Sequence, residues 1–162
     1  MTPRIETIAK KKLVGMKVRL TIASAGPKTQ ELWQGFRPRV DEVQNTVGPN
    51  SLSVQQYDPG MSIASLTPAT EFNRWATVEV AEWGTLPEGM EQLMVPAGMY
   101  AIFVHKGPAQ TFIQTWLHIF QEWLPASDYA LDERPHFEVL TPAYRLDDPN
   151  AEEEIYIPIK LR

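Results

Sequence analysis

Hydrophobic and polar residues alternate along several stretches of the chain, and each stretch predicts a β-strand. The first extends from about residue 5 to residue 23, where apolar side chains recur at every second position from Val14 to Ile22. Turn-forming pairs such as Gly26-Pro27 separate these stretches from their neighbours. Further strands are expected over residues 52–57, 75–83, 91–105 (interrupted at Pro96), 136–140 and 154–159.

Two other segments have the apolar spacing of an amphipathic helix. Residues 29–43 place apolar side chains at helical intervals around Trp33, and Pro38 should kink or divide that helix. Residues 110–124 carry a wide apolar stripe, and Pro125 should end the second helix. Between the helices, residues 47–50 are expected to form a turn and residues 61–73 an irregular loop.

The order of predicted elements is the same in both halves of the chain. Each half reads strand, helix, strand, strand, and landmarks recur at a nearly constant distance. Gly15-Met16 and Gly98-Met99 are 83 residues apart, Gly26-Pro27 and Gly107-Pro108 are 81 apart, and Trp33 and Trp116 are again 83 apart.

This repetition predicts a fold of the α+β class. We expect pseudo-repeats over about residues 4–84 and 88–161, joined in a single domain that spans residues 1–162. One helix over a thin sheet would bury little apolar surface, whereas two halves that share one sheet bury much more. The prediction is therefore an antiparallel sheet formed by duplicated strand–helix–strand–strand halves, with two main helices and a central ligand groove.

Composition and charge exclude several classes of protein. Hydrophobic residues make up 43% of the 162 residues, which is enough for a core and argues against disorder. Fifteen Lys and Arg against 20 Asp and Glu give a net charge of −5 without a basic block, so direct binding of nucleic acid is disfavoured. The absence of cysteine excludes thiolate zinc sites, disulfides and cysteine nucleophiles. No signal peptide and no membrane-spanning segment is recognisable, and a cytoplasmic location is expected.

The usual catalytic motifs are also missing. His105, His118 and His136 fall in three different predicted elements without the spacing of metal ligands, so no metal is expected. No glycine-rich nucleotide or phosphate loop occurs, which leaves no cofactor to expect, and no serine nucleophile elbow is present.

Glu138 is the acidic residue with the most suggestive position. Strand alternation places it with His136 on one face of residues 136–140 and Phe137 on the other. The repeat aligns Glu138 with Gln55, so the two polar groups would sit on central strands, in the groove between the helices. A carboxyl group in such a groove would have a raised pKa and would attract a cation or a hydrogen-bond donor. The alternative is a solvent-facing residue paired with Arg134 or Arg145.

Aromatic side chains could form the walls of a site beside that carboxylate. Those on the apolar helix faces, Trp33 among them, are expected mainly in the core, while those on strands can lie on either face. A cleft with aromatic rims and one carboxylate would favour flat or cationic organic ligands. The strand aromatics are Tyr57, Trp75, Tyr100 and Tyr156.

Several motifs in order give the chain a resemblance to a known family. The segments KKLVGMKV, LWQGF, VPAGMYAIFVHKGP, FQEWLPAS, RPHFEVL and EIYIPI resemble the GyrI-like small-molecule-binding domain, which also serves as the effector-binding domain of AraC- and MerR-class transcription regulators in bacteria. The resemblance covers nearly the whole chain. It implies a pseudo-twofold duplication in which Glu138 is the central acidic group of a ligand groove. The other ligand-binding residues that we predict, partly from this resemblance, are Tyr100, Phe103, Tyr156, Trp123, Trp75, Gln55 and Trp33.

The chain departs from the family pattern at two points. No helix-turn-helix segment is recognisable, so the chain is expected to be a stand-alone version that does not bind an operator itself. Val139 follows the Phe-Glu pair where an aromatic residue is frequent in the family, which leaves the shape of the pocket floor open.

Three functions follow from this reading. The first is a protein that captures apolar or aromatic organic compounds, including cationic ones. The second is a hydrolase of reactive electrophilic compounds that uses Glu138 as a general base and a tyrosine, Tyr156 or Tyr100, as hydrogen-bond donor. The third is a protein-interaction module similar to gyrase inhibitors. The expected partners are a small organic ligand and, as further options, a protein partner or a second copy of the chain, without a membrane or nucleic acid.

Overall fold

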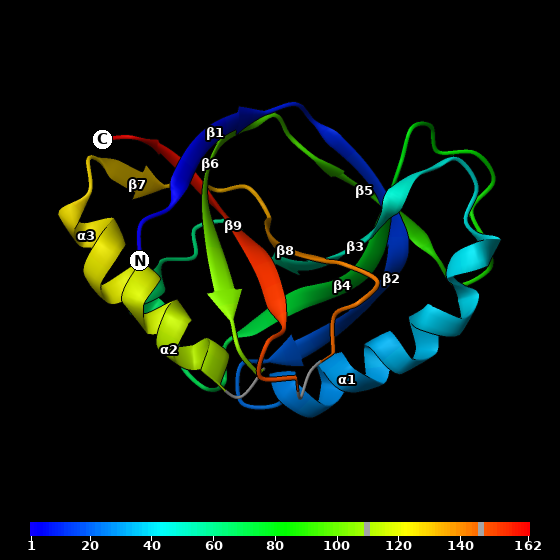
Figure 1. Ribbon diagram of the computed structural model, residues 1–162, viewed down its shortest axis with the longest axis horizontal. Helices are drawn as coiled ribbons and strands as arrows, with labels where there is room; N and C mark the ends of the chain where they lie inside the picture. The colour runs from blue at the N-terminus through cyan, green and yellow to red at the C-terminus, as the bar shows by residue number, and fades with distance from the viewer. Residues whose placement is uncertain (109–110, 146–147) are drawn as a thin grey trace.

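The alternating segments form the strands of one antiparallel sheet, seen in the computed structural model of the protein (Figure 1). The structure describes residues 1–108, 111–145 and 148–162, and nine strands occur in that part of the chain. Eight follow one another in the order β1-β6-β9-β8-β3-β4-β2-β5, and the short β7 pairs with β9. The strands are β1 Arg4–Ile8, β2 Lys11–Thr21, β3 Thr46–Gln56, β4 Glu71–Val80, β5 Glu91–Val95, β6 Gly98–Lys106, β7 Tyr129–Leu131, β8 His136–Leu140 and β9 Glu152–Leu161.

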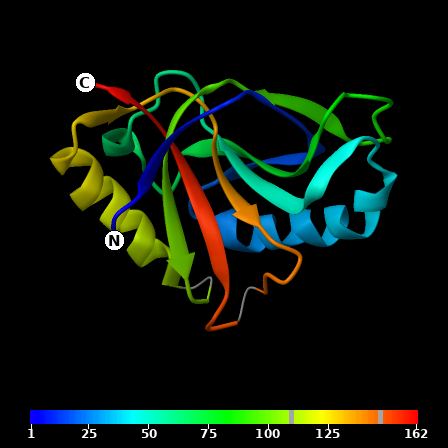
Figure 2. The ribbon, with the colours of Figure 1, turned by 45° about the horizontal axis from the view of Figure 1, so that its top comes forward.

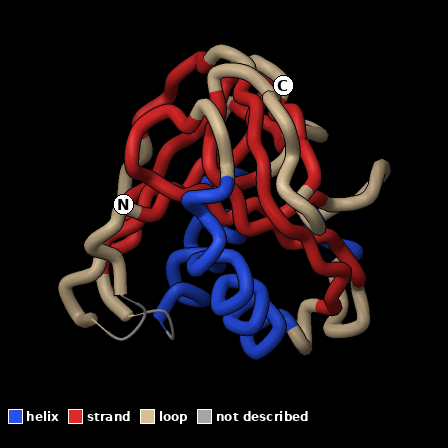
Figure 3. The backbone as a smooth tube through the Cα atoms, turned by 90° about the vertical axis from the view of Figure 1, so that its right-hand side faces the viewer, coloured by secondary structure: helices blue, strands red, loops and turns tan. Residues whose placement is uncertain are grey.

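Both predicted helices form and lie against the same face of the sheet. They diverge from neighbouring N-terminal ends, and the strands arch over them (Figures 1 and 3). Pro38 divides the first helix as expected, because the α-helix ends at Phe36 and a 3-10 helix follows. The second helix continues one residue past Pro125. The helical segments are α1 Ala25–Phe36, η1 Arg37–Glu42, η2 Ile63–Ser65, α2 Phe112–Leu117, the π-helical η4 His118–Trp123, and α3 Leu124–Ala126.

The sheet is buried on both faces. On the helix-bearing face, Trp33 and Phe36 of α1 pack against β2 and β4, while Phe120 of η4 packs against β6 and β9. On the opposite face the sheet curls back on itself, so that its outer strands enclose a third apolar cluster. That cluster contains Leu13, Leu52, Val54, Trp75, Val95, Tyr100, Ile102 and Phe137.

The pairing register shows the duplication of the two halves. In the β1–β6 pair Ile8 lies opposite Gly98, and in the β2–β5 pair Gly15 lies opposite Glu91. Ile8 and Glu91 are related by a step of 83 residues, and so are Gly15 and Gly98. Each half therefore gives its first strand to the second strand of the other half. The predicted fold of two duplicated halves around one sheet is confirmed.

The centre of this symmetry lies between β3 and β8. Val54 faces Phe137 there, and the same step of 83 residues relates these two positions. The cross-strand pairs on either side of Val54 and Phe137 are equivalent to each other by the same step of 83 residues. Equivalent residues of the two halves therefore lie close together at the middle of the sheet. These flanking pairs are Ser53 with Glu138 and Gln55 with His136.

Some boundaries differ from the sequence prediction. Residues 47–50, which we expected to form a turn, lie within β3, where the register with β4 shifts between Thr46 and Ser51. The strand expected over residues 5–23 is two strands, since the chain leaves edge strand β1 after Ile8 and continues as β2, which lies next to the opposite edge strand β5. Strand β7, three residues long, has too short a pattern for the alternation to predict.

Candidate functional site

A groove of about 1050 Å³ opens on the helix-bearing face, beside α1 and the start of α2. The chain leaves the end of β8 toward α1 (Figure 2), and Pro142, Tyr144 and Arg145 of that segment line one side of the groove. Its lining includes side chains from α1 (Thr29, Gln30, Trp33 and Gln34), from the start of η1 (Arg37), from α2 (Phe112), and from the sheet and the segment after β8 (Ser53, Arg74, Glu138, Leu140, Tyr144, Arg145 and Glu153).

Glu138 lies at the floor of the groove. Its β8 neighbours Phe137 and Val139 point to the opposite face and pack in the cluster there, so the predicted alternation is observed. Glu138 is 6% exposed and accepts a hydrogen bond of 2.6 Å from Nε2 of Gln55. Loss of water raises the pKa of the Glu138 carboxyl, and the Arg74 guanidinium and the Gln55 amide oppose that rise.

Glu153 brings a second carboxyl group into the same groove. Ile155 of β9 lies opposite Glu138, so Glu153, two positions earlier, is its diagonal neighbour on the same face, at roughly 7–8 Å between Cα atoms. Glu153 is 8% exposed and forms no ion pair with any residue that the structure describes. Burial, and then the charge of Glu138, raise the pKa of Glu153 to about 8.

Arg74 of β4 supplies the positive charge at the floor. Its Nη1 donates a hydrogen bond of 3.1 Å to the Ser53 hydroxyl and lies 3.8 Å from Oε1 of Glu138. Its Nε is buried and has no hydrogen-bond partner among the described residues. The floor thus combines two buried carboxyl groups with one guanidinium that is incompletely hydrogen-bonded.

Aromatic side chains and one arginine form the walls. Trp33 and Tyr144 are buried in the same apolar cluster and both border the groove. Arg37 lies over the Trp33 ring, 5.4 Å from its centroid. Burial raises the pKa of Tyr144 to about 12, so its hydroxyl remains a hydrogen-bond donor at neutral pH.

The structure brings three of the predicted ligand-binding residues together and separates the other five from them. Glu138, Gln55 and Trp33 meet at the groove, Gln55 through its hydrogen bond to Glu138. The other five are not part of the described lining of this groove: strand alternation turns three of them to the opposite face, and the other two lie on the helix-bearing side but in the core under the second helix. Trp75, Tyr100 and Tyr156 pack on the opposite face of the sheet, and Phe103 and Trp123 fill the core between the second helix and the sheet.

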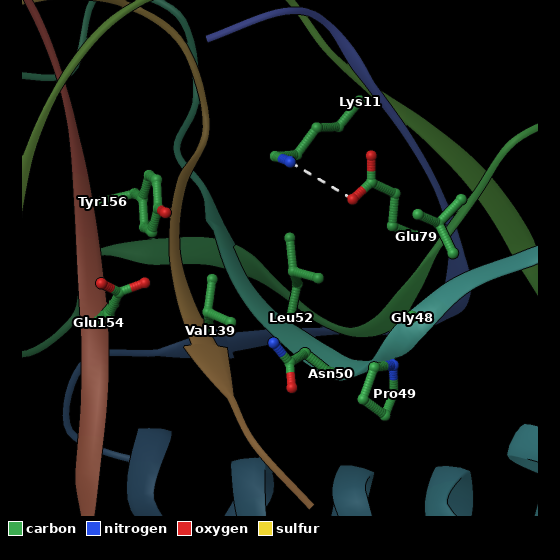
Figure 4. Close-up of a pocket in the computed structure, with 10 residues that line it drawn as sticks. Lys11, Gly48, Pro49, Asn50, Leu52, Glu79, Val139, Glu154 and Tyr156 are labelled. Atoms are coloured by element: carbon green, nitrogen blue, oxygen red, sulfur yellow. Dashed lines mark hydrogen bonds and ion pairs between the residues drawn. The ribbon is translucent and has the colours of Figure 1, made fainter. Parts of the chain in front are cut away.

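Tyr156 belongs to a different hollow. Its ring stacks on Phe137 at 4.5 Å between centroids, on the face away from Glu138. There it borders a small pocket of about 220 Å³ together with Glu154 and an ion pair between Lys11 and Glu79, 3.3 Å long (Figure 4). The structure therefore separates Tyr156 from Glu138, although we predicted that the two would share one site. Tyr100 also lies on the face opposite Glu138, where its hydroxyl donates a hydrogen bond of 3.0 Å to the Pro135 carbonyl.

Most residues that line the groove were not predicted from the sequence, among them Glu153, Arg74 and Tyr144. Glu153 stands in the run Glu152-Glu153-Glu154, which is typical of a solvated surface, yet alternation from Ile155 and Ile157 would have placed it on the buried face. Arg74 and Tyr144 carry no comparable signal. Arg74 precedes the strand residues that alternate most clearly, and Tyr144 lies in a turn-rich segment without periodicity.

Two negative findings apply to residues 1–108, 111–145 and 148–162. No group of three or more His, Asp or Glu residues in that part of the chain is arranged to hold a metal ion. Nor is any helix there long and apolar enough to cross a membrane.

Comparison with known proteins identifies relatives of the whole chain. Residues 1–160 match the family of GyrI-like small-molecule-binding domains. The chain is 31% identical over 140 residues to the transcriptional regulator BrlR of Pseudomonas aeruginosa, a match that covers 85% of this chain and 48% of the regulator. It is 35% identical over 99 residues to the DNA gyrase inhibitor of Erwinia billingiae, covering 57% of this chain and 61% of the inhibitor. The chain thus matches about half the length of the regulator and less than two thirds of the inhibitor.

The fold also matches solved structures. The structure of SAV2435 bound to tetraphenylphosphonium superposes with a TM-score of 0.74 at 13% identity, covering 99% of this chain and 94% of the other. At that identity the likeness concerns the fold.

Proposed function

Because the chain belongs to the family of GyrI-like small-molecule-binding domains, we propose that it binds organic cations with aromatic groups in the groove on the helix-bearing face. Glu138 is the central acidic group of this site. The observation that carries the proposal is a buried carboxyl group at the floor of a groove of about 1050 Å³ whose walls include aromatic rings.

Charge favours a cation over a neutral or anionic ligand. Two carboxyl groups, Glu138 and Glu153, face one guanidinium, that of Arg74, and each glutamate is less than a tenth exposed. A positive charge placed between the carboxylates replaces the solvation that they lost on folding. The rings of Trp33 and Tyr144 would add contacts with the apolar parts of the ligand and cation–π attraction.

The relatives accord with this proposal. SAV2435 was solved with tetraphenylphosphonium, a bulky aromatic cation, and BrlR is a transcriptional regulator. A cytoplasmic location also accords with relatives that are a transcriptional regulator and a DNA gyrase inhibitor. Action on a protein partner, as the name of the inhibitor implies for that protein, stays a prediction for this chain.

Binding of tetraphenylphosphonium to the wild type and to Glu138→Gln tests the proposal. We expect the variant to bind at least tenfold more weakly, equivalent to about 1.4 kcal/mol, because the amide keeps the shape of the side chain and removes its charge. Isothermal titration calorimetry measures both dissociation constants. Triphenylphosphine oxide, which has three of the aromatic groups but no net charge, should bind more weakly to the wild type and equally to both proteins.

Glu154→Gln is the matched control. Glu154 is the neighbour of Glu153 in β9 but lies on the opposite face of the sheet, where it pairs with Arg4 at 2.7 Å. This variant should bind tetraphenylphosphonium as the wild type does. Equal affinity of the wild type and Glu138→Gln would show that Glu138 does not attract the cation.

Hydrolysis of an electrophilic ligand is the second candidate, and the position of Tyr144 favours it. Tyr144 brings a phenol to the groove that holds Glu138, where the carboxylate could accept a proton from water and the phenol could donate to the departing oxygen. Incubation with an electrophilic alkylating compound should then give product that depends on the protein. Loss of product formation in both Glu138→Gln and Tyr144→Phe would support this function, and product formation equal to that of buffer alone would contradict it.

A further inference from the structure

The charges at the floor of the groove do not balance if every titratable group there is ionised. Glu138 and Glu153 would carry two negative charges, and Arg74 carries one positive charge. The two other positively charged side chains that line the groove, those of Arg37 and Arg145, contact other groups. Arg37 lies over Trp33, and Nη1 of Arg145 donates hydrogen bonds to the carbonyl oxygens of Pro142 and Tyr144.

A buried charge without compensation is costly, so a carboxyl group in this position is stabilised by binding a proton. Glu153 is the better candidate of the two. Glu138 has the hydrogen bond from Gln55 and the nearby guanidinium to stabilise its ionised form, whereas Glu153 has no ion pair within the described residues. The rise of the pKa of Glu153 to about 8 agrees with this assignment.

Building on the proposed function, on which this inference rests, we propose that the groove exchanges one proton for one organic cation, with Glu153 as the group that holds the proton. In the empty groove Glu153 is neutral and Glu138 balances Arg74. When a cation enters, the O–H bond of Glu153 breaks, the proton passes to solvent, and the new carboxylate balances the charge of the ligand. The floor is neutral in both states, which explains the presence of a second acid beside Glu138.

Three other titratable side chains near the pair, those of Tyr57, Tyr144 and His136, do not supply such a proton. Burial raises the pKa of Tyr57 and of Tyr144 to about 12 and lowers the pKa of His136 to about 3, so none of the three changes its charge between pH 6 and 9. Arginine remains protonated throughout. His105 is the cross-strand neighbour of Glu153, and its Nδ1 is 2.8 Å from the Thr115 hydroxyl. Because it lies directly opposite Glu153 on the neighbouring strand, His105 serves as the control residue for the experiment.

Calorimetry of tetraphenylphosphonium binding in buffers with different ionisation enthalpies counts the protons released. At pH 7 we expect close to one proton released per cation bound, falling toward zero by about pH 9.5. The association constant should rise roughly tenfold per pH unit from pH 6 to 7.5 and level off above about pH 8.5. The sign follows because the proton and the cation compete, so a lower proton concentration favours the cation.

Three variants assign the proton. Glu153→Gln keeps the size of the side chain and has no proton to release, so its binding should release none and should not depend on pH from 6 to 9. Glu138→Gln removes the negative charge that helps to raise the pKa of Glu153, so any proton release that accompanies cation binding to this variant should occur at lower pH. His105→Gln should release as many protons as the wild type. Thermal melting of each variant confirms that it is folded.

The results separate this inference from the function on which it rests. Tight binding of the cation without proton release, and with an affinity independent of pH, would overturn the exchange and leave cation binding intact. Release that persists in Glu153→Gln, or that disappears in His105→Gln, would overturn the role of Glu153. No binding of tetraphenylphosphonium by the wild type at any pH would contradict the proposed function itself, and the exchange with it.

Discussion

A carboxyl group that loses its water on folding destabilises the folded protein more as the pH rises, and Glu153 is such a group. Its pKa is raised from an ordinary 4.5 to about 8, so between these values the folded protein holds a proton that the unfolded chain releases. The stability that this group contributes is therefore complete below about pH 4.5 and is lost as the pH rises toward 8.

Glu153→Gln should remove that loss. We expect the melting temperature of the variant, relative to the wild type, to increase progressively from pH 5 to about pH 8 and to level off above it, because the amide has no proton to release. Melting curves over this range measure the difference. Glu152→Gln is the matched control, since the Glu152 side chain is 60% exposed, and its difference from the wild type should not vary in this way. A constant difference for both variants would mean that Glu153 is solvated in the folded protein.

At the scale of elements, Gly15 permits the close approach of the paired strands β2 and β4. A Cβ atom at this position would overlap the carbonyl oxygen of Ala76 in the neighbouring strand. This contact is with backbone, which cannot move aside without disturbing the ladder. The glycine that the repeat singled out in the sequence is thus required by the packing of two strands.

Gly15→Ala should destabilise the protein by about 1–3 kcal/mol, the range typical of overpacking. Urea denaturation measures the change in the free energy of unfolding. Gly26→Ala is a useful comparison, because a Cβ atom at Gly26 in α1 meets nothing within 4 Å, and alanine favours a helix. We expect this second variant to be as stable as the wild type or slightly more stable. Comparable losses in both would contradict the account of Gly15.

The elements were largely predictable from the sequence because each depends on local periodicity. The alternation over residues 136–140 correctly separated Glu138 from Phe137, and Pro38 correctly divided the first helix. Alternation tells which residues share a face, but it does not tell which face carries the groove when both faces are buried. Tyr156 stacks on Phe137 and therefore lies away from Glu138, and this placement depends on the pairing register of β8 with β9, which strand alternation alone does not give. The burial of Arg74 depends on strands far apart in the chain.

At the scale of the whole molecule, the sheet has a central pair and two outer strands. The central pair is β3 and β8, and the outer strands are β1 and β5. Backbone amides of the central strands become accessible to solvent only when most of the sheet unfolds, whereas those of an edge strand become accessible when its end frays locally. We expect amides of β3 and β8 to exchange with deuterium at least tenfold more slowly than those of β1 and β5. Mass spectrometry of exchanged peptides measures this, and protection of β1 equal to that of β8 would contradict the strand order.

The exchange of first strands between the halves also determines how the molecule can come apart. If the chain were cut in the connection between β4 and β5, one fragment would keep β1 without its partner β6, and the other would keep β5 without its partner β2. Neither fragment could complete its own sheet, and each would present an unpaired edge that only the other fits. In this respect the two halves of the chain resemble the two subunits of a dimer. The floor of the groove is built from β3 and β4 of one half and β8 and β9 of the other, so it exists only while the two halves are associated.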